Sequence, residues 1–210
     1  MDQIKLNIFP ATIFPPLHIC SSLVRVDEIT IDVHEHYVKK SYRNRYDILG
    51  PNGVHTLSIS LIKGKNAQLP MREVRIANHQ NWQQRHYKSI KAAYGNAPYY
   101  DHFIDEIQPL FHTKFNFLVD FNITSLQSIL KCLSLSNEIN KTERYYTSEE
   151  IQHADIRNAF HSDRNQLSKS PGQQKYIQVF SDRFEFEPNL SILDLLFCKG
   201  PESLSYLTQI

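Results

Sequence analysis

The densest group of polar side chains in the sequence lies between residues 35 and 45. Glu35, Tyr37 and Lys39 alternate with other residues, so an extended segment would turn an acid, a phenol and an amine toward one side. In such a trio, Lys39 or Tyr37 can stabilise the charge that develops in a transition state. We therefore treat Glu35, Tyr37 and Lys39 as catalytic candidates.

The second part of this group reads Tyr42-Arg43-Asn44-Arg45. Arg43 and Arg45 share one face of an extended segment, and two guanidinium groups can bind a carboxylate or a phosphate through paired hydrogen bonds. Tyr42 and Asn44 complete this predicted substrate-binding group. The alternative is structural, because charged residues also protect an exposed strand edge from pairing with another chain.

Two histidines stand out by their place in the chain. His86 comes one helical turn after Trp82 on a mostly apolar helix face, where an imidazole could act as a general base. A hydrogen-bonded core histidine is the alternative. His18 follows Pro15-Pro16-Leu17, and its strand–loop–histidine–helix order is similar to that of the phosphate-binding histidine in adenylyl-transfer folds. The second histidine and the lysine motif of those folds are missing.

An aromatic connection, Tyr94-Gly95-Asn96-Ala97-Pro98-Tyr99-Tyr100, joins two predicted helices. Tyrosines combine an apolar ring with a polar tip and can pack against a sugar or another planar ligand. Tyr94 and Tyr99 are therefore predicted to bind substrate, and Trp82 is placed with them. Packing in the core or in the turn is the alternative for all three.

No motif in the sequence indicates a metal or a known cofactor. His34 and His36 flank Glu35 and could chelate only weakly, and no H-x-x-x-H or H-E-x-x-H occurs. Glycine-rich phosphate loops and the G-x-S-x-G elbow are also missing. The three cysteines, Cys20, Cys132 and Cys198, lie far apart in apolar contexts and are predicted to be buried thiols in a reducing compartment.

The overall composition is that of a globular domain in water. The chain has 210 residues, of which 41% are hydrophobic and 21% charged, which excludes intrinsic disorder. Its formal net charge is +1, from 23 basic and 22 acidic residues, which argues against nucleic acid as a partner. No apolar run approaches the ~20 residues of a membrane span, and no secretion signal is recognised at the start. We therefore expect a cytoplasmic protein.

The elements that must position these residues are predicted from hydrophobic periodicity and turn residues. A strand, a helix opened by Pro15-Pro16 and a second strand are expected to form a parallel β-α-β unit, followed by an antiparallel hairpin around Gly50-Pro51-Asn52-Gly53. The predicted strands are Ile4 to Phe9, Glu28 to Val33, Tyr42 to Leu49, Val54 to Ile62, Val74 to Ile76 and Tyr176 to Phe180.

Helices are predicted to dominate the second half of the chain. They begin at Asn81 and at Tyr99, run from Asn122 to Leu133, and end with a helix capped by Ser191. Residues 137–174 are polar and are expected to form an excursion or lid. The predicted fold class is α/β, as one domain over residues 1–210 with a small mixed sheet.

Several of these motifs occur together in a known family. Asn44-Arg45 before a hairpin, Trp82-x-x-x-His86, Ala93-Tyr94-x-x-Ala97-Pro98-Tyr99-Tyr100 and a closing Asn189-Leu190-Ser191-Ile192-Leu193-Asp194-Leu195-Leu196 resemble the WbqC-like family from about Asn7 to Leu207. The residues from Glu35 to Arg45 resemble its Bacteroidetes-type branch. The start differs, with Asn7-Ile8-Phe9-Pro10 where many members have Gln-Pro-x-Tyr-Phe-Pro.

The resemblance implies a role in the synthesis of O-antigen or other surface polysaccharides. It suggests a transferase that adds a small acyl or aminoacyl group, such as glycyl, to a nucleotide-linked or lipid-linked sugar. In that hypothesis His86 is the general base, and Arg43 and Arg45 hold a phosphate or carboxylate. A non-catalytic sugar-nucleotide-binding or assembly protein of the same pathway is the alternative, and a nucleotidyltransferase-like enzyme is a third hypothesis.

Overall fold

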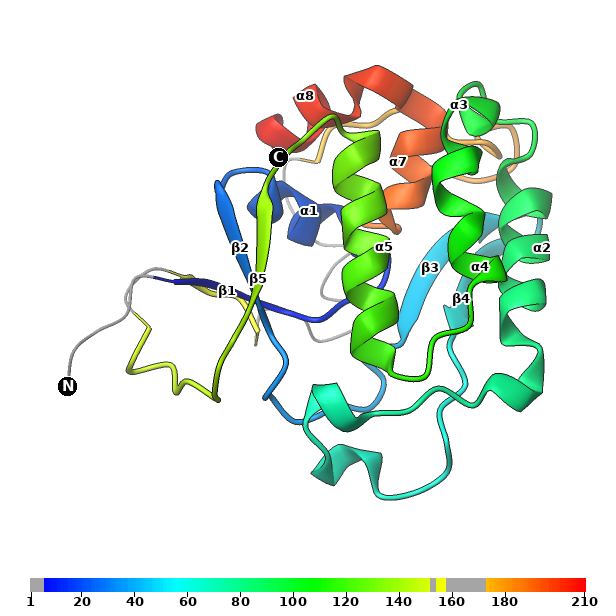
Figure 1. Ribbon diagram of the computed structural model, residues 1–210. Coiled ribbons are helices and arrows are strands. Elements are labelled where there is room, and N and C mark those ends of the chain that lie inside the picture. Colours follow the sequence, from blue (N-terminus) through cyan, green and yellow to red (C-terminus); the bar gives the residue numbers. More distant parts are fainter. Residues whose placement is uncertain (1–5, 152–153, 158–172) are drawn as a thin grey trace.

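The computed structural model describes residues 6–151, 154–157 and 173–210 (Figure 1). Its first sheet has four parallel strands in the order β5-β2-β1-β6. Its second sheet is an antiparallel pair, β3-β4. The α/β class is therefore confirmed, and the parallel and antiparallel pairings occur in two separate small sheets.

The first three elements form the predicted β-α-β unit: β1 (Asn7–Pro10), α1 (Leu17–Leu23) and β2 (Glu28–Asp32). The two strands are parallel, with Ile8 opposite Thr30 and Pro10 opposite Asp32. Strands of a parallel sheet are covered on both faces, and the run from Ile29 to Asp32 is correspondingly buried throughout.

Two further strands complete this sheet at its edges. β5 (Glu138–Lys141) pairs with β2, and β6 (Ala154–Asp155) pairs with β1. Both lie inside the range 137–174, which the sequence predicts to be a polar excursion. Edge strands that are short and partly exposed carry little hydrophobic signal, which explains why they were not predicted. Residues 158–172 of that range lie outside the described residues.

The hairpin consists of β3 (Arg45–Gly50) and β4 (Gly53–Ser58), joined by Pro51 and Asn52. Gly53 has a φ of 98°, a conformation that glycine adopts without steric cost. β4 ends before the predicted Ile62. The predicted strand at Val74 to Ile76 is also wrong, since Arg75 and Ile76 make only isolated bridges.

The main helices are α2 (Trp82–Tyr94), α3 (Tyr100–Ile107), α4 (Pro109–His112), α5 (Leu118–Cys132), α7 (Ile192–Lys199) and α8 (Ser203–Gln209). The helix predicted to begin at Tyr99 divides at Pro109, which has no N–H to donate. The predicted strand from Tyr176 to Phe180 is irregular backbone, and α8 was not predicted.

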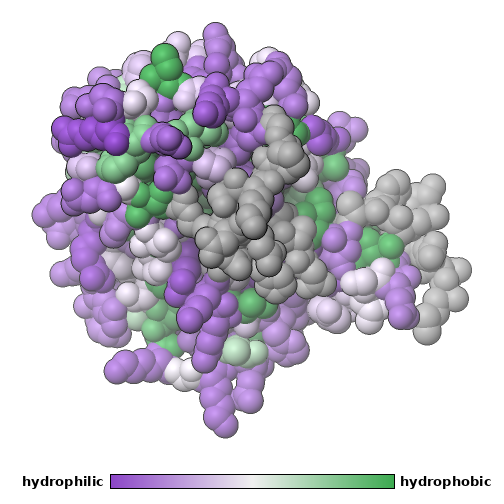
Figure 2. All heavy atoms as spheres, turned by 180° about the vertical axis from the view of Figure 1, so that it is seen from behind, coloured by the Kyte–Doolittle hydropathy of each residue, from purple (hydrophilic) through white to green (hydrophobic). Residues whose placement is uncertain are grey.

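Helix α5 lies between the parallel sheet and the hairpin with its neighbouring helices (Figure 1). Its Phe121 ring meets Trp82 edge-on, with 5.3 Å between ring centroids, and Phe14 at 6.3 Å. Phe14 in turn lies 5.0 Å from the Tyr46 ring of the hairpin. These fully buried aromatic rings join both sheets and the helices in one core. The face of the molecule that points away from the viewer in Figure 1 is shown in Figure 2, and it is mainly hydrophilic with small hydrophobic areas.

Asn122 provides a polar link inside this core. Its amide Nδ2 donates hydrogen bonds of 2.8 Å to the carbonyl oxygens of Ala11 and Arg43. Ala11 follows β1 and Arg43 precedes β3, so one side chain of α5 ties the parallel sheet to the hairpin. Asn122 is 1% exposed, and water cannot replace these bonds.

We expect Asn122→Ala to lower the free energy of unfolding by about 2–4 kcal/mol, because it leaves two buried carbonyl groups without donors and opens a small cavity. Urea unfolding followed by circular dichroism measures this. Asn66→Ala is the matched control, since its amide bond to Ile62 is exposed and its loss should change stability by less than about 0.5 kcal/mol. Equal stabilities for the two variants would contradict the prediction.

Candidate functional site

Charged side chains gather at the carboxyl ends of the parallel strands. Ligands of open α/β sheets bind outside this edge of the sheet. Here β2 ends at Asp32, and Thr142 directly follows β5. We define the carboxyl-edge cluster as Asp32, Glu35, Arg43, Thr142 and Arg157, which are all buried.

Asp32 is the centre of this cluster. Its Oδ1 accepts hydrogen bonds from the backbone N–H groups of His34 and Glu35, both at 2.9 Å, and from the Thr142 hydroxyl at 3.1 Å. Its Oδ2 accepts a bond of 2.6 Å from Arg157 Nη1. Asp32 therefore fixes the turn after β2 and joins it to the ends of β5 and β6.

Arg157 is held by two carboxylates and a ring. Its Nε and Nη2 donate to both oxygens of Asp155, at 2.8 and 2.7 Å, and its guanidinium lies 5.0 Å from the Tyr145 ring centroid. The hydrogen bonds from Arg157 lower the pKa of Asp155. Burial would lower the pKa of Arg157, but its bonds to Asp155 and Asp32 outweigh that effect and raise it. Each of the three guanidinium nitrogens of Arg157 thus donates a hydrogen bond to a carboxylate of the protein.

Glu35 and Arg43 form a second buried pair. Arg43 Nε donates to Glu35 Oε1 at 2.8 Å, and Nη2 bonds the other oxygen. Burial raises the pKa of Glu35, while the hydrogen bond and charge of Arg43 oppose that rise. The predicted catalytic acid and the first predicted anion-binding arginine are thus each other's partner, which leaves neither free for a substrate in this arrangement.

The other predicted residues of this stretch divide between interior and surface. Tyr37 is buried and donates a hydrogen bond of 2.9 Å to Asn44 Oδ1, and Asn44 Nδ2 donates to the carbonyl of Ile59. Tyr42 is buried as well. Lys39 is exposed, so it does not share the buried surroundings of Glu35 and Tyr37, and the three side chains are not gathered as the sequence predicts.

Arg45 differs from the other arginines of the site. Its side chain is half-buried, its Nε is buried without a hydrogen-bond partner, and no carboxylate pairs with it among the residues that the structure describes. Burial raises the pKa of Tyr37, and the positive charges of Arg45 and Arg43 oppose the rise. Within the described part of the chain, Arg45 therefore supplies a positive charge near Tyr37 that no carboxylate neutralises.

His86 lies in the core between α2 and the hairpin. Tyr46 donates a hydrogen bond of 3.0 Å to Nδ1, and Nε2 donates one of 3.2 Å to the carbonyl of Ser58. The fully buried Trp82 ring packs edge-on against it at 5.2 Å. Burial lowers the pKa of His86 to about 4. Both ring nitrogens are occupied, so this placement does not support the general-base role expected of His86, or substrate contact by Trp82.

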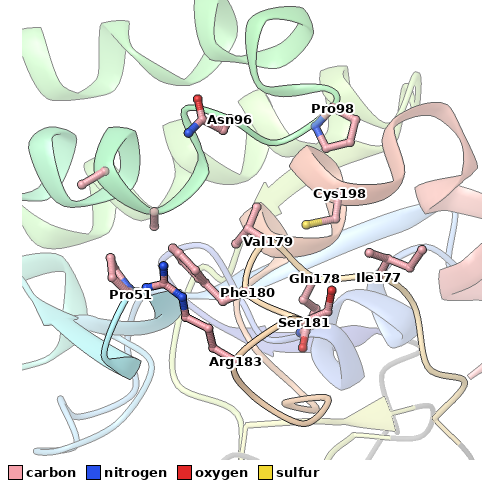
Figure 3. Close-up of a pocket in the computed structure, with 12 residues that line it drawn as sticks. Pro51, Asn96, Pro98, Ile177, Gln178, Val179, Phe180, Ser181, Arg183 and Cys198 are labelled. Carbon is pink, nitrogen blue, oxygen red and sulfur yellow. The ribbon is translucent and has the colours of Figure 1, made fainter.

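The predicted aromatic connection lies on another side of the molecule. Tyr94 is fully buried, donates to Asp194 Oδ1 at 3.0 Å and accepts from the backbone N–H of Leu49 at 3.1 Å. The Tyr99 ring packs against Gly200, where a Cβ atom would collide with Cδ1 of that ring. The φ of Gly200, 59°, also favours glycine. A cavity of about 630 Å³ opens beside this connection and contains neither tyrosine (Figure 3).

That cavity has a mixed lining. Asn96 and Pro98 come from the connection itself, and Arg183 extends toward the Phe180 ring in Figure 3. The Cys198 thiol faces it, with a pKa that burial raises. The three cysteines are free thiols, as predicted, although only Cys20 is buried and the other two are half-buried.

Sequence reasoning missed several residues that form the carboxyl edge. Asp32 ends a correctly predicted strand, so the rule for parallel sheets could have singled out Asp32 and His34. Thr142 and Arg157 follow strands that the sequence does not indicate. No signal in the sequence could have connected them to Asp32, more than 100 residues away.

Comparison with known proteins places this chain. The model of the WbqC-like protein family matches residues 11–180, and the chain belongs to that family. It is 26% identical over 211 residues to the uncharacterized protein Rv1507c of Mycobacterium tuberculosis, covering 87% of this chain and 88% of that protein. No solved structure matches it.

Two features are absent from the described part of the chain. None of the helices there has the length and apolar character needed to cross a bilayer. Nor do histidine, cysteine and carboxylate side chains gather there in a group of three that could hold a metal ion.

The environment of His86 predicts how stability depends on pH. The pKa of His86 is about 4 in the folded protein and about 6.5 in an unfolded chain, so the unfolded state binds more protons between these values. The free energy of unfolding therefore falls as the pH falls through this window. We expect His86 to account for about 2 kcal/mol of the loss between pH 7 and pH 5. His18, whose pKa burial also lowers to about 4, adds a loss of the same sign.

Urea unfolding at pH 7 and pH 5 measures this contribution. His86→Asn should lose less stability over the interval than the wild type, even though it is less stable at pH 7. His36→Asn serves as the control because His36 is exposed, and it should follow the wild type. The same pH dependence in His86→Asn and the wild type would contradict the prediction.

Proposed function

We propose that this protein is a transferase that adds a small acyl or aminoacyl group, with glycyl as one candidate, to a sugar in surface polysaccharide or O-antigen synthesis. Membership of the WbqC-like family supports the pathway. The half-buried guanidinium of Arg45, which has no carboxylate partner among the described residues and acts on the nearby Tyr37, supports the type of substrate.

The argument from Arg45 is electrostatic. A cation that is partly removed from water without a counter-charge is unfavourable, and a bound anion removes that cost. The flat guanidinium can donate two parallel hydrogen bonds to a phosphate or a carboxylate. Nucleotide-linked sugars, coenzyme A thioesters and amino acids all carry such groups. A donor or acceptor held by Arg45 would lie close to the phenol of Tyr37.

The remaining predicted residues have supporting roles in this proposal. Two interactions hold the residues that precede Arg45. Glu35 pairs with Arg43, and Tyr37 donates a hydrogen bond to Asn44. Lys39, on the exposed side, is free to approach a ligand from solvent. A cytoplasmic place of action fits this proposal.

Two other functions are consistent with the same site. A protein that binds a sugar nucleotide without reaction would use Arg45 in the same way and would show no turnover. Nucleotidyl transfer is favoured by the strand order, in which β2 and β5 lie on one side of β1 and β6 lies on the other. His18 lies in the first turn of α1, the helix that follows β1 in the chain. That function requires the binding of a nucleotide with Mg²⁺.

The first test is a thermal-shift panel of nucleotide sugars, coenzyme A and acetyl-coenzyme A, ATP with Mg²⁺, and glycine. A ligand at a hundred times its Kd stabilises the fold by about 2.7 kcal/mol, which raises the Tm by roughly 5–10 °C for a domain of this size. We expect one class of anion to give such a shift, and Arg45→Met to abolish it.

Arg72→Met is the matched control, because Arg72 is exposed and pairs with its neighbour Glu73, and it should retain the shift. A ligand shift that survives in Arg45→Met would overturn the role of Arg45. Incubation of the ligand class that binds with sugar acceptors, followed by mass spectrometry, then separates an enzyme from a binding protein.

A further inference from the structure

We propose that His34 Nε2 is the proton acceptor of a general-base site at the carboxyl edge of the parallel sheet, with Thr142 and Asp32 as its positioning residues. His34 follows Asp32 by two positions, in the turn directly after β2. The inference rests on the proposed function for its substrate, the hydroxyl or amino group of a sugar that receives the acyl group.

The hydrogen bonds of Thr142 determine which nitrogen of His34 carries the proton. A hydroxyl group has one proton to donate and two lone pairs that accept. The carboxylate of Asp32, paired with Arg157, can only accept, so the bond of 3.1 Å between the two side chains takes the Thr142 proton. The backbone N–H of Val33 occupies one lone pair of Thr142 Oγ1 at 3.2 Å.

The second lone pair of Thr142 Oγ1 faces His34 Nδ1 at 3.1 Å. Because the only hydroxyl proton is already engaged, this contact is a hydrogen bond only if Nδ1 carries a proton. In the neutral imidazole the proton on Nδ1 leaves a lone pair on Nε2, which has no partner among the described residues. Thr142 thus fixes the tautomer in which Nε2 is the base.

The backbone holds the ring in place as well. The N–H of His34 is bonded to the same Asp32 oxygen that accepts from Thr142, so main chain and side chain of His34 are anchored to one carboxylate. His34 is half-buried, in contrast to His86, which is 3% exposed and bonded at both nitrogens. A base needs both features: an oriented ring and one free nitrogen that a substrate can reach.

The chemical step follows from this arrangement. His34 Nε2 takes the proton of the sugar hydroxyl or amine, while the oxygen or nitrogen of that sugar group forms a bond to the acyl carbon of the donor. The bond from that carbon to the leaving group then breaks, the leaving group departs with the electron pair, and the imidazolium returns the proton to it. The bond from Nδ1–H to Thr142, and through it to Asp32, stabilises the positive ring between the two transfers.

The tautomer can be measured without a substrate. In protein labelled with ¹⁵N at histidine, we expect the neutral ring of His34 to show a protonated Nδ1 and an unprotonated Nε2, the reverse of the tautomer that a histidine side chain prefers in water. Thr142→Val should return His34 to the ordinary tautomer, Thr142→Ser should keep the one seen in the wild type, and Thr124→Val, which removes an exposed hydroxyl of α5, should change nothing. A wild-type His34 that is protonated on Nε2 would overturn the inference.

Activity provides the second test. With the donor class identified by the Arg45 experiment, His34→Gln should lower kcat about 10²–10⁴-fold and leave the ligand-induced thermal shift unchanged. His36→Gln, at the exposed neighbouring position, should keep full activity. Full turnover by His34→Gln overturns this inference but leaves the proposed function intact. If no donor and acceptor pair gives turnover in the wild type, the transferase proposal fails, and the inference is overturned with it.

Discussion

A carboxylate with no exposure to solvent organises one whole edge of this protein. Asp32 accepts hydrogen bonds from two backbone N–H groups, a hydroxyl and a guanidinium, and these donors belong to the ends of β2, β5 and β6. An isolated buried charge would be strongly unfavourable, so the arrangement is stable only while Arg157 and Thr142 remain in place. The short edge strands supply these two partners. The few backbone hydrogen bonds of β5 and β6 would hold these strands only weakly, and the bonds of Thr142 and Arg157 to Asp32 stabilise them further.

The hairpin is held against this sheet by polar links and by packing. Asn122 donates to one carbonyl that follows β1 and to one that precedes β3. The pair of Glu35 and Arg43 joins the turn after β2 to the residues that precede β3. The aromatic rings of Phe14, Tyr46 and Phe121 fill the space between. Arg45 begins β3 directly after these anchors. A side chain that binds an anion with directional hydrogen bonds needs such a rigid base, because each ångström of freedom weakens the paired geometry.

The parts of the fold that could be predicted are those whose residues carry a local signal. The β-α-β unit and the hairpin follow from alternation, prolines and the Gly50 to Gly53 turn, and the long helices follow from their apolar faces. β5 and β6 could not be predicted, because an edge strand is defined by the neighbour that it meets and not by its own composition. The same holds for the site. The polar residues from Glu35 to Arg45 were predicted as one group, whereas the structure pairs Glu35 with Arg43 and leaves Lys39 exposed. Such pairing depends on contacts across the fold, which give Arg43 and Arg45 different surroundings although both are arginines on one short run.

His34 and His86 show why residue type and helical context could not decide which histidine is the base. Both rings are oriented by hydrogen bonds, and His86 lies on the more suggestive sequence pattern. The difference is in the count of donors and acceptors around each ring. Tyr46 and the Ser58 carbonyl use both nitrogens of His86, so it has the partners of a structural residue. Thr142 bonds Nδ1 of His34 and can only accept there, because its own proton is engaged by Asp32 and its other lone pair by Val33. One ring nitrogen becomes available for chemistry when the protein bonds the other nitrogen of the same ring and gives the first no partner. That condition is met for His34 after β2 and not for His86 in α2.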